Sequence, residues 1–582
     1  MSASTGSLID TRRHQMFPTL EPAEIERLRR FGDERSYRDG EYLARTGEVA
    51  QGSFVILKGE VVIRQSDERG SRPPIVVHGP GSLMGELAQL SGRPSLVDGI
   101  AQGDVEALLI PPHQLRNLLV AEAELGERIM RALILRRVGL LETGVGGPVI
   151  VGRAEQSDVL RLEGFLTRNG HPHQRLDPDS DADAKALLER FQVDPRELPI
   201  VLCPNGRMLR NPGEAELARC IGLLRAIDPA KVYDAVIVGA GPAGLAAAVY
   251  AASEGLSVLV VDCRAFGGQA GASARIENYL GFPTGISGLA LMARAYNQAQ
   301  KFGAEMVIPD EVVRLDCHPT SQDARFEIGL ANGERASARA VIIASGARYR
   351  RLDVENLAEF EGSSVHYWAS PLEGRLCAGQ EVALVGAGNS AGQAAVYLAS
   401  QVAKVWLLVR GSSLEATMSR YLVDRIAALS NLEVLLQTEI SALEGRDGAL
   451  EAVRWRRRST GEEIRRPFRH LFLSIGADPN TAWLSQYDVT LDAKGFVRTG
   501  ADVDGNRRPL ETSHLGIFAI GDVRCGSVKR VAAAVGEGAQ VVATLHDFLA
   551  EAGTPRAGVA TGLLNRASQV RVPPGAPEDS TA

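Results

Sequence analysis

YDAVIVGAGPAGLAAAVYAASEGLSVLVVD runs from Tyr233 to Asp262 and decides the fold of the largest part of the chain. An apolar run, a glycine turn, small residues and a second apolar run predict strand, turn, helix and strand. Gly239, Gly241 and Gly244 permit a tight turn and let a pyrophosphate approach the helix N-terminus. Asp262 ends the second strand, where a carboxylate accepts from an adenosine ribose and repels a 2′-phosphate. The stretch therefore predicts a dinucleotide site for an unphosphorylated adenosine ribose.

QEVALVGAGNSAGQAAVYLASQVAKVWLLVR repeats this design further along the chain and ends at Arg410. Its turn reads Gly386-x-Gly388-x-x-Ala391, and its second strand ends in an arginine, which accommodates a 2′-phosphate. Glu415 follows closely and counts against that preference. The two sites are therefore predicted to bind FAD first and NADPH second, with NADH as the alternative to NADPH.

The rest of the composition is ordinary for globular domains. Hydrophobic residues are 45%, charged residues 23%, and the net charge of -7 over 582 residues indicates neither nucleic acid nor anionic membrane. No apolar run reaches about 18 residues, and the first residues, MSASTGSLIDTRRHQM, lack the apolar stretch of a secretory signal. None of the six cysteines lies within three residues of another, which predicts a cytoplasmic protein without a disulfide framework.

The front of the chain is predicted to form two smaller domains. Residues 17–142 combine short apolar runs with frequent glycines, which indicates a small β-barrel or jelly roll flanked by helices. In residues 147–228 the spacing of the apolar residues changes. The new pattern predicts a small α/β domain, with a hairpin at Asn205-Gly206. The ends, 1–16 and 552–582, are predicted to be disordered tails.

Six further motifs carry a family resemblance: GGQ at 267–269, IENYLGFP at 276–283, VIIASGA at 341–347, SIGADPNT at 474–481, LGIFAIGDV at 515–523 and KRVAAAVGEGA at 529–539. With them, the chain from Lys231 to about Glu551 resembles the low-molecular-weight thioredoxin reductases. The resemblance implies an FAD domain split into 231–347 and 474–551. It also implies an NAD(P)H domain at 348–473, inserted between the two parts, so that two Rossmann-like domains are expected.

The resemblance also implies which residues bind the cofactors. For FAD they are Gly239, Gly241, Pro242, Ala243, Gly244, Asp262, Gly268, Gln269, Asn278, Gly521, Asp522, Arg530, Val531 and Ala532. For NADPH they are Gly386, Gly388, Asn389, Ser390, Ala391 and Arg410. Asp522 would bind the flavin ribityl chain, and Arg530, Val531 and Ala532 would lie along the isoalloxazine. Of the three arginines in the family's NADPH signature, only Arg410 is present.

Trp368-Ala369-Ser370-Pro371 stands where the family carries its redox dithiol, Cys-Ala-Thr-Cys. Disulfide exchange needs a thiolate, and neither Trp368 nor Pro371 can supply one. Two interpretations of Trp368 stay open. It packs between domains, or it covers the flavin and controls what can approach.

Gly85-Glu86-Leu87-Ala88 resembles the phosphate-binding cassette of cyclic-nucleotide-binding domains. There the glutamate takes the ribose 2′-OH and backbone N–H groups face the phosphate. The family's phosphate-binding arginine follows a proline, but here Ser95 follows Pro94, and Arg93 lies on the other side. Ordinary cAMP binding, a different or weaker ligand, and a degenerate structural module are the three alternatives.

Residues 147–228 resemble a thioredoxin or glutaredoxin fold, with Leu198-Pro199 in the place of its cis-proline. The dithiol of that fold would follow the first strand, where this chain reads Gly152-Arg153-Ala154-Glu155-Gln156. His171-Pro172-His173 has no partner at metal-ligand spacing, so a surface loop and no metal site are predicted. The basic run 454–458 is predicted to be a solvated hairpin beside the NAD(P)H site rather than a nucleic-acid strip.

These observations predict a cytoplasmic, FAD-dependent NAD(P)H oxidoreductase in which NADPH reduces the flavin and the flavin passes electrons to a small-molecule or protein acceptor. One alternative is a thioredoxin-disulfide reductase that uses other cysteines. Another is a non-catalytic sensor of nucleotide or redox state. Family analogy implies a homodimer. A cyclic nucleotide is the candidate ligand of the first domain, and neither a nucleic-acid nor a membrane partner is expected.

Overall fold

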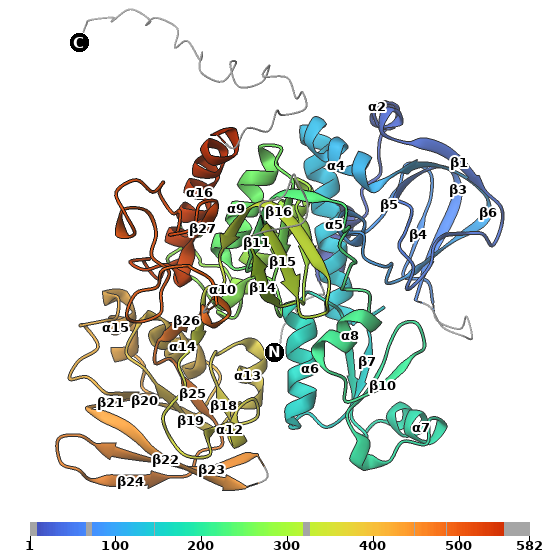
Figure 1. The fold of residues 1–582 in the computed structure, drawn as a ribbon. Helices are drawn as coiled ribbons and strands as arrows, with labels where there is room; N and C mark the ends of the chain where they lie inside the picture. The colour runs from blue at the N-terminus through green and yellow to red at the C-terminus, as the bar shows by residue number, and fades with distance from the viewer. Residues whose placement is uncertain are drawn as a thin grey trace, which may run out of the picture.

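A seven-stranded sheet forms the centre of the molecule (Figure 1). The structure, a computed structural model, describes residues 8–65, 73–144, 146–317, 326–446, 448–484 and 486–551. The sheet order is β13-β12-β11-β16-β15-β14, with β27 against β16. Its strands are β11 (Val232–Val238), β12 (Val258–Val261), β13 (Glu305–Val307), β14 (Val312–Asp316), β15 (Phe326–Leu330), β16 (Arg335–Ile343) and β27 (Ile517–Ala519).

Helices built from small residues cover this sheet. The glycine turn opens α9 (Pro242–Ser253), as predicted. Against α9 packs α16 (Val531–Glu551), and a Cβ on Gly538 would lie 2.6 Å from the carbonyl oxygen of Ala243. The close approach of two helix backbones therefore requires a glycine there. Two further helices of this unit are α10 (Gly268–Gly271) and α11 (Gly288–Lys301).

A second parallel sheet carries the second glycine turn. Its order is β18-β25-β19-β20-β21, and the two-stranded β17-β26 ribbon joins it to the central unit. The strands are β17 (Ala347–Tyr349), β18 (Val365–His366), β19 (Glu381–Val385), β20 (Lys404–Val409), β21 (Leu432–Leu436), β25 (Leu471–Leu473) and β26 (Ala477–Pro479). The helices are α12 (Leu357–Phe360), α13 (Pro371–Leu376), α14 (Asn389–Ala399) and α15 (Arg420–Ala427). An antiparallel sheet of β22 (Thr438–Arg446), β23 (Ala449–Arg457) and β24 (Glu463–Arg466) lies at its edge.

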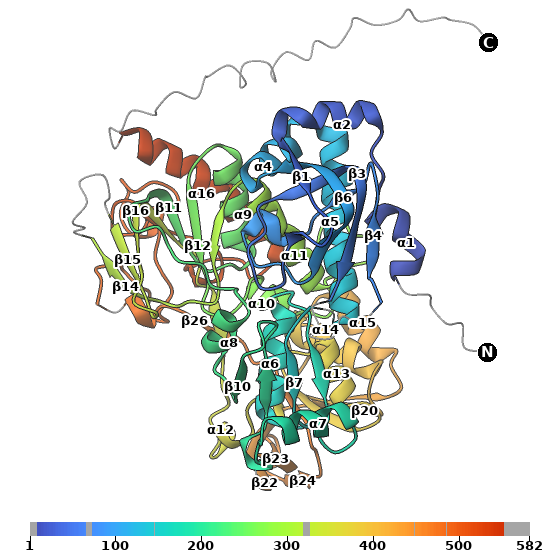
Figure 2. The same ribbon diagram turned by 90° about the vertical axis from the view of Figure 1, so that its right-hand side faces the viewer.

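The first unit is an antiparallel six-stranded sheet, in the order β1-β6-β3-β4 with β2 on β6 and β5 on β3. Its strands are β1 (Asp33–Tyr37), β2 (Tyr42–Ala44), β3 (Ser53–Arg64), β4 (Val76–His78), β5 (Leu83–Met84) and β6 (Asp98–Ile110). The helices are α1 (Leu8–Met16), α2 (Pro22–Leu28), α3 (Ala88–Ser91), α4 (Pro112–Ala121) and α5 (Ala123–Thr143). Figure 2 shows the long α5 between the sheet of this unit and the central unit.

The second unit has a four-stranded sheet in the order β10-β9-β7-β8, with β7 and β8 parallel and the other pairs antiparallel. Its elements are β7 (Val149–Val151), α6 (Ser157–Arg168), β8 (Gln174–Leu176), α7 (Ala182–Arg190), β9 (Ile200–Leu202), β10 (Met208–Arg210) and α8 (Glu214–Cys220). The Leu198–Pro199 peptide bond is cis, as expected.

Three sequence predictions need correction. Residues 8–16, expected within a disordered tail, form α1, and the side chain of Met16 is buried. A disulfide joins Cys203 to Cys220 although none was expected, because the fold brings together cysteines 17 residues apart. His171, expected in a surface loop, is buried. Residues 1–7 and the predicted tail 552–582 lie outside the described residues. Among the described helices, none is both long and apolar enough to cross a membrane.

Candidate cofactor and ligand sites

The first glycine turn is closed on one side and open on the other. Gly239 has a φ of +111°, and a Cβ there would lie 2.2 Å from the carbonyl oxygen of Ala344 at the end of β16. At Gly241, by contrast, an added Cβ would meet only the Cα of Gly268, at 4.0 Å. The turn is therefore pressed against the sheet while space remains in front of α9. Such a cradle fits the pyrophosphate of a dinucleotide at the N-terminus of a helix.

Asp262 connects the turn to the strand that follows it. Its Oδ2 accepts the Ala240 N–H at 2.8 Å, and its Oδ1 accepts those of Arg264 and Ala265 at 3.1 and 3.2 Å. Desolvation raises the pKa of Asp262, and these three donors offset part of that effect. A carboxylate has about four acceptor positions, so one remains for a ribose hydroxyl. Asp262 therefore both shapes the turn and can bind the ribose.

Other predicted FAD residues lie close to the same helix end. A Cβ on Gly268 would be 3.1 Å from the Cα of Gly241, and one on Gly521 would be 2.8 Å from the Cβ of Ala243. Pro242 and Gly244 lie in the first turn of α9. The side chain of Gln269 donates to the carbonyl oxygen of Ala347. The structure thus brings these residues together, and their contacts with FAD remain predictions.

The predicted C-terminal FAD motif places the charge pair Asp522–Lys529 beside the N-terminus of α16. Asp522 belongs to the short 3-10 helix Gly521–Val523, and desolvation raises its pKa while Lys529 lowers it. The Lys529 ammonium donates to the Asp522 carbonyl oxygen at 2.6 Å. Arg530, Val531 and Ala532 lie at the start of α16. A carboxylate next to a helix start suits a polyhydroxyl chain such as ribityl.

Asn278 lies at the boundary with the second nucleotide-binding unit. It lines a hollow of about 430 Å³ together with Tyr421 and Arg425 of α15. Across this boundary Arg425 Nη1 lies 2.6 Å from Glu277 Oε2. Asn278 therefore belongs to the contact between the two nucleotide-binding units.

The second glycine turn repeats the geometry of the first. A Cβ on Gly386, whose φ is +150°, would lie 2.4 Å from the carbonyl oxygen of Ser474, whereas one on Gly388 would meet nothing within 4 Å. Asn389 Oδ1 accepts the Ser419 N–H at 2.7 Å, which ties the turn to α15. Ser390 is exposed and Ala391 is buried. The space in front of α14 therefore fits a second dinucleotide.

Arg410 has basic neighbours that its sequence position does not reveal. The pKa of Glu439 is lowered, first by a hydrogen bond from Arg456 at 2.8 Å and then by the charges of Arg458 and Arg410, which outweigh desolvation. The backbone connects these groups, because Gln437 N–H donates to Gly411 O at 2.9 Å and Arg458 N–H to Gln437 O at 2.8 Å. Three guanidinium groups therefore surround one carboxylate, which leaves net positive charge beside Arg410.

The predicted hairpin that starts at 454–458 is confirmed, because β23 turns directly into the antiparallel β24, although Trp455 within it is not solvated. Trp455 is buried on one face of β23, while Arg454 and Arg456 are exposed on the other, and Arg457 is exposed at the end of the strand. The signal that could have located Arg456 and Arg458 was this run of arginines. Its relation to Arg410 depends on backbone hydrogen bonds of Gln437, between β21 and β22, and is not visible in the sequence.

The segment 368–371, where the resemblance places a dithiol, is held by a buried carboxylate. Trp368 Nε1 donates to Glu373 Oε1 at 3.0 Å, and the N–H and hydroxyl of Ser370 both donate to Glu373 Oε2, the N–H at 2.9 Å. Glu373 is 6% exposed. Pro371 begins α13 and brings Glu373 into this position, since proline is favoured at a helix start. The replacement residues therefore form an ordered structure of their own.

Trp368 lies where three units meet. The guanidinium of Arg168, at the end of α6, is 5.5 Å from the Trp368 ring centre and donates to the carbonyl oxygen of Gly268 at 3.1 Å. The ring of Tyr349 lies 6.2 Å from that of Trp368. Packing between domains is thus observed. Gly268 is also a predicted FAD residue, so the same position is consistent with control of access to the flavin.

The four free cysteines among the described residues all have raised thiol pKa values. Desolvation first and neighbouring carboxylates second raise the pKa to about 12 for Cys263, beside Asp262, and for Cys377, beside Glu373. The pKa values of Cys317 and Cys525 are raised too, chiefly by desolvation. The nucleophile in disulfide exchange is the thiolate. At neutral pH these groups are therefore thiols and poor nucleophiles.

The cassette of the first unit uses its polar groups internally. Glu86 Oε1 lies 2.6 Å from Arg137 Nε, and its Oε2 accepts the Ala88 N–H at 2.6 Å. Ser95 donates its hydroxyl to the carbonyl oxygen of Val97 at 2.7 Å, and Leu87 is buried.

Arginines from α5 and the cassette also have partners of their own. Arg136 donates to the carbonyl oxygens of Gly85 and Leu83, each at 2.8 Å. Arg93 donates to the hydroxyl of Tyr296, in the central unit, at 2.8 Å. A cyclic nucleotide would therefore have to compete with Arg137 for Glu86.

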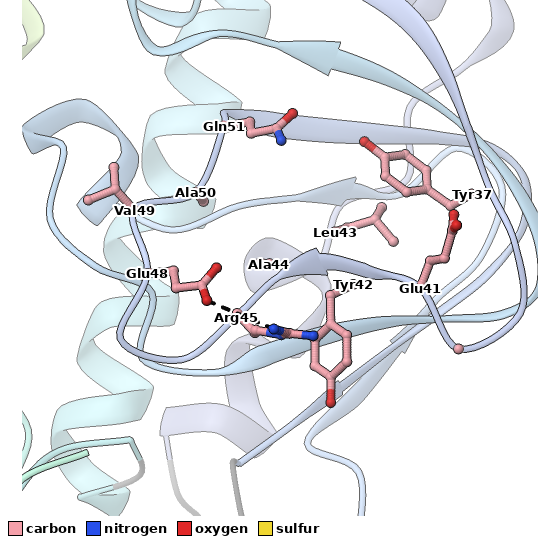
Figure 3. A pocket seen from close by; sticks show the side chains of 11 residues that line it. Tyr37, Glu41, Tyr42, Leu43, Ala44, Arg45, Glu48, Val49, Ala50 and Gln51 are labelled. Atoms are coloured by element: carbon pink, nitrogen blue, oxygen red, sulfur yellow. Dashed lines mark ion pairs between the residues drawn. The ribbon is translucent and has the colours of Figure 1, made fainter. Parts of the chain in front are cut away.

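A separate hollow of about 610 Å³ opens on the outer side of the first sheet (Figure 3). Arg45 lies over the ring of Tyr42, 4.2 Å from its centre, and 4.0 Å from Glu48 Oε1. Its lining comes from residues 37–51 and includes neither Glu86 nor Ser95. The hollow nevertheless borders the cassette, because the Ser95 N–H donates to the carbonyl oxygen of Glu48 at 2.8 Å.

Comparison with known proteins now identifies the class. Residues 233–538 match the family described as pyridine nucleotide-disulphide oxidoreductase, and residues 34–122 match the cyclic nucleotide-binding domain. The chain belongs to the pyridine nucleotide-disulphide oxidoreductases and is a thioredoxin reductase-like, FAD-dependent NAD(P)H oxidoreductase with an N-terminal cyclic nucleotide-binding domain. The predicted enzyme class is confirmed, as is the use of FAD and NADPH by the family.

Individual relatives cover the C-terminal half. The chain is 34% identical over 321 residues to thioredoxin reductase of Mycolicibacterium smegmatis. This match covers 55% of this chain and 97% of the relative. It is 31% identical over 336 residues to an alkyl hydroperoxide reductase polypeptide of Pseudomonas putida, a match that spans 56% of this chain but only 60% of the relative. The crystal structure of Lactococcus lactis thioredoxin reductase aligns with a TM-score of 0.50 at 28% identity, over 55% of this chain and 99% of that one.

Proposed function

We propose that this protein passes hydride from NADPH to FAD and electrons from FAD directly to an acceptor, without the active-site dithiol of thioredoxin reductases. The observation that carries this proposal is the segment 368–373. Trp368 and Pro371 stand where the family resemblance places the dithiol, and Glu373 fixes the segment through three hydrogen bonds. The raised pKa values of the four free cysteines further support a route without thiolates.

The chain's own groups would bind and orient the cofactors. FAD, when bound, supplies the two-electron chemistry. The first glycine turn and Asp262 would position its pyrophosphate and adenosine ribose, and Asp522 its ribityl chain. The second glycine turn would position the pyrophosphate of NADPH. Arg410 with Arg458 would bind its 2′-phosphate, because guanidinium groups form strong charge-assisted hydrogen bonds with phosphate.

Arg410→Ala and Arg458→Ala should each raise the KM for NADPH much more than the KM for NADH. A charge-assisted hydrogen bond contributes about 1.5–3 kcal/mol, which corresponds to a tenfold to hundredfold change. Stopped-flow measurement of flavin bleaching with both nucleotides tests this result. Arg457→Ala, next to Arg458 at the end of β23, is the matched control and should alter neither. Wild-type protein that is saturated at lower NADH than NADPH would show that Glu415 and Glu439 outweigh the arginines.

The first domain is proposed to bind cyclic nucleotides weakly and to serve mainly as a structural module. Glu86 is already paired with Arg137, and Ser95 offers no charge to a cyclic phosphate. Ser95→Arg should therefore tighten cAMP binding by about tenfold to hundredfold, the effect of one charge-assisted hydrogen bond. Calorimetry with cAMP and cGMP measures this. Submicromolar binding of cAMP by the wild type would contradict the proposal and mean that another base serves the phosphate.

The second domain is proposed to have a thioredoxin-like fold that has lost its redox role. Its sheet order and its cis Leu198–Pro199 bond support that assignment. In the antiparallel β7-β9 pair Val151 lies opposite Ile200, so Cys203 follows β9 at the other end of the sheet from residues 152–156. The Cys203–Cys220 disulfide thus lies away from the position of a thioredoxin dithiol. A homodimeric, cytoplasmic protein remains part of the proposal.

A further inference from the structure

A cluster of metal-binding side chains lies in the second nucleotide-binding domain, beside the segment 368–373. It comprises His366 at the end of β18, Cys377 just after α13 and His470 just before β25. One donor atom from each, two imidazole nitrogens and a sulfur, lies within 4.8 Å of the other two. His366 and Cys377 are buried, and His470 is half-buried. The enclosed position separates this cluster from the exposed acidic groups that are common on protein surfaces.

The nitrogen geometry matches a tetrahedral metal. His366 Nε2 and His470 Nδ1 are 3.1 Å apart. In a tetrahedral zinc site with Zn–N bonds of about 2.0–2.1 Å, two ligating nitrogens lie about 3.3 Å apart. The two imidazoles therefore need to separate by only a few tenths of an ångström to ligate one ion. Two histidines and one cysteine are also a ligand set that zinc accepts, with the fourth position left to water.

Charges of both signs lie near the cluster, since the Glu373 carboxylate favours a cation and the Arg469 guanidinium, next to His470, opposes one. Glu373 lies one helical turn before Cys377, and the Cys377 N–H donates to the Glu373 carbonyl oxygen at 3.0 Å. The carboxylate of Glu373 is 6% exposed and its charge acts on the Cys377 sulfur. On metal binding the Cys377 thiol releases its proton to solvent and a metal–thiolate bond forms. The thiolate and the Glu373 carboxylate then balance the two positive charges of zinc.

We propose that His366, Cys377 and His470 bind a zinc ion that clasps both ends of the segment 367–376. His366 precedes this segment and Cys377 follows it, while His470 anchors both to the parallel sheet. The segment includes Trp368 and Pro371, so the metal fixes the residues that replace the dithiol. No motif in the sequence indicates this site, because His470 is 93 residues beyond Cys377 in the chain.

Elemental analysis of the FAD-loaded protein, purified without chelators, tests the proposal. About one zinc per chain is expected. Cys377→Ser and His470→Gln should each bind zinc more than about 100-fold more weakly than the wild type. This loss is larger than the one expected when a residue that only supports a metal ligand is substituted. Cys317→Ser is the matched control and should keep its zinc. With Co²⁺ as the probe, wild type and Cys317→Ser should show a thiolate-to-cobalt charge-transfer band that Cys377→Ser lacks.

A wild-type measurement covers the case in which a ligand variant does not fold. Removal of the metal with a chelator should lower the Tm of the wild type, and added Zn²⁺ should restore it. Wild-type protein that retains no zinc after incubation with Zn²⁺ and gel filtration would overturn the proposal and leave a hydrogen-bonded histidine pair. Equal zinc binding by wild type and Cys377→Ser would overturn it too. Binding of copper but not zinc would overturn the choice of ion. None of these readouts depends on NADPH oxidation.

Discussion

Gly239→Ala is expected to yield protein that does not retain FAD. The added Cβ would lie 2.2 Å from the carbonyl oxygen of Ala344, and the residue would have to keep a φ of +111°. The left-handed backbone alone costs about 1–2 kcal/mol, and overpacking adds about 1–3 kcal/mol. The turn would have to move away from the sheet and out of the position that fits a pyrophosphate. Flavin absorbance of the purified variant, before and after incubation with FAD, is the measurement.

Gly255→Ala provides the matched control for Gly239→Ala. Gly255 follows α9 with a φ of +87°, but a Cβ there would meet nothing within 4 Å. This variant has the left-handed strain without the overlap, and it should retain FAD. If Gly239→Ala keeps its flavin as tightly as Gly255→Ala does, the first glycine turn is not the FAD site. If both lose flavin, backbone strain rather than the shape of the turn is the cause.

The second large effect concerns the acceptor. With NADPH, wild-type protein should reduce thioredoxin and small disulfides no faster than the background rate, while it reduces quinones, dyes or oxygen measurably. The reason is chemical, because the segment 368–371 contains no sulfur that could carry electrons from flavin to a disulfide. Parallel assays with thioredoxin, a small disulfide and a one-electron dye decide this. Rapid thioredoxin turnover would instead favour the alternative of a disulfide reductase that uses other cysteines.

Substitution of Trp368 distinguishes control of acceptor access to the flavin from a role in packing alone. Trp368→Ala removes the ring that lies between Arg168, Tyr349 and Glu373, so rates with large acceptors should change while NADPH-dependent bleaching of the flavin stays the same. Trp483→Phe is the control, since Trp483 packs in another core cluster. Identical acceptor rates in wild type and Trp368→Ala would reduce Trp368 to a packing residue.

The two dinucleotide turns could be predicted from sequence because their causes are local. Gly239 and Gly386 have positive φ values, and α9 is built from small residues. Both features can be read from residues that lie within a few positions of one another. The absence of sulfur at 368–371 is likewise read directly from the chain.

Features that depend on distant segments could not be predicted. The pairing of Glu86 with Arg137 needs α5 to pack against the cassette. The backbone of Arg458 is linked to Gly411, next to Arg410, only through Gln437. The Cys203–Cys220 disulfide closes between a hairpin and a helix end. Spacing along the chain carries no signal for such contacts, so rules based on neighbouring cysteines or arginines miss them.

Anaerobic titration of the flavin with NADPH tests the dithiol-free route most directly. If electrons pass only through FAD, one equivalent of NADPH per bound FAD should bleach the flavin completely, and thiol counting should find the Cys203–Cys220 disulfide still intact. A requirement for two equivalents, with the appearance of two new thiols that Cys203→Ser prevents, would show that a disulfide shares electrons with the flavin. That result would contradict the proposed function and establish this chain as a disulfide-using reductase.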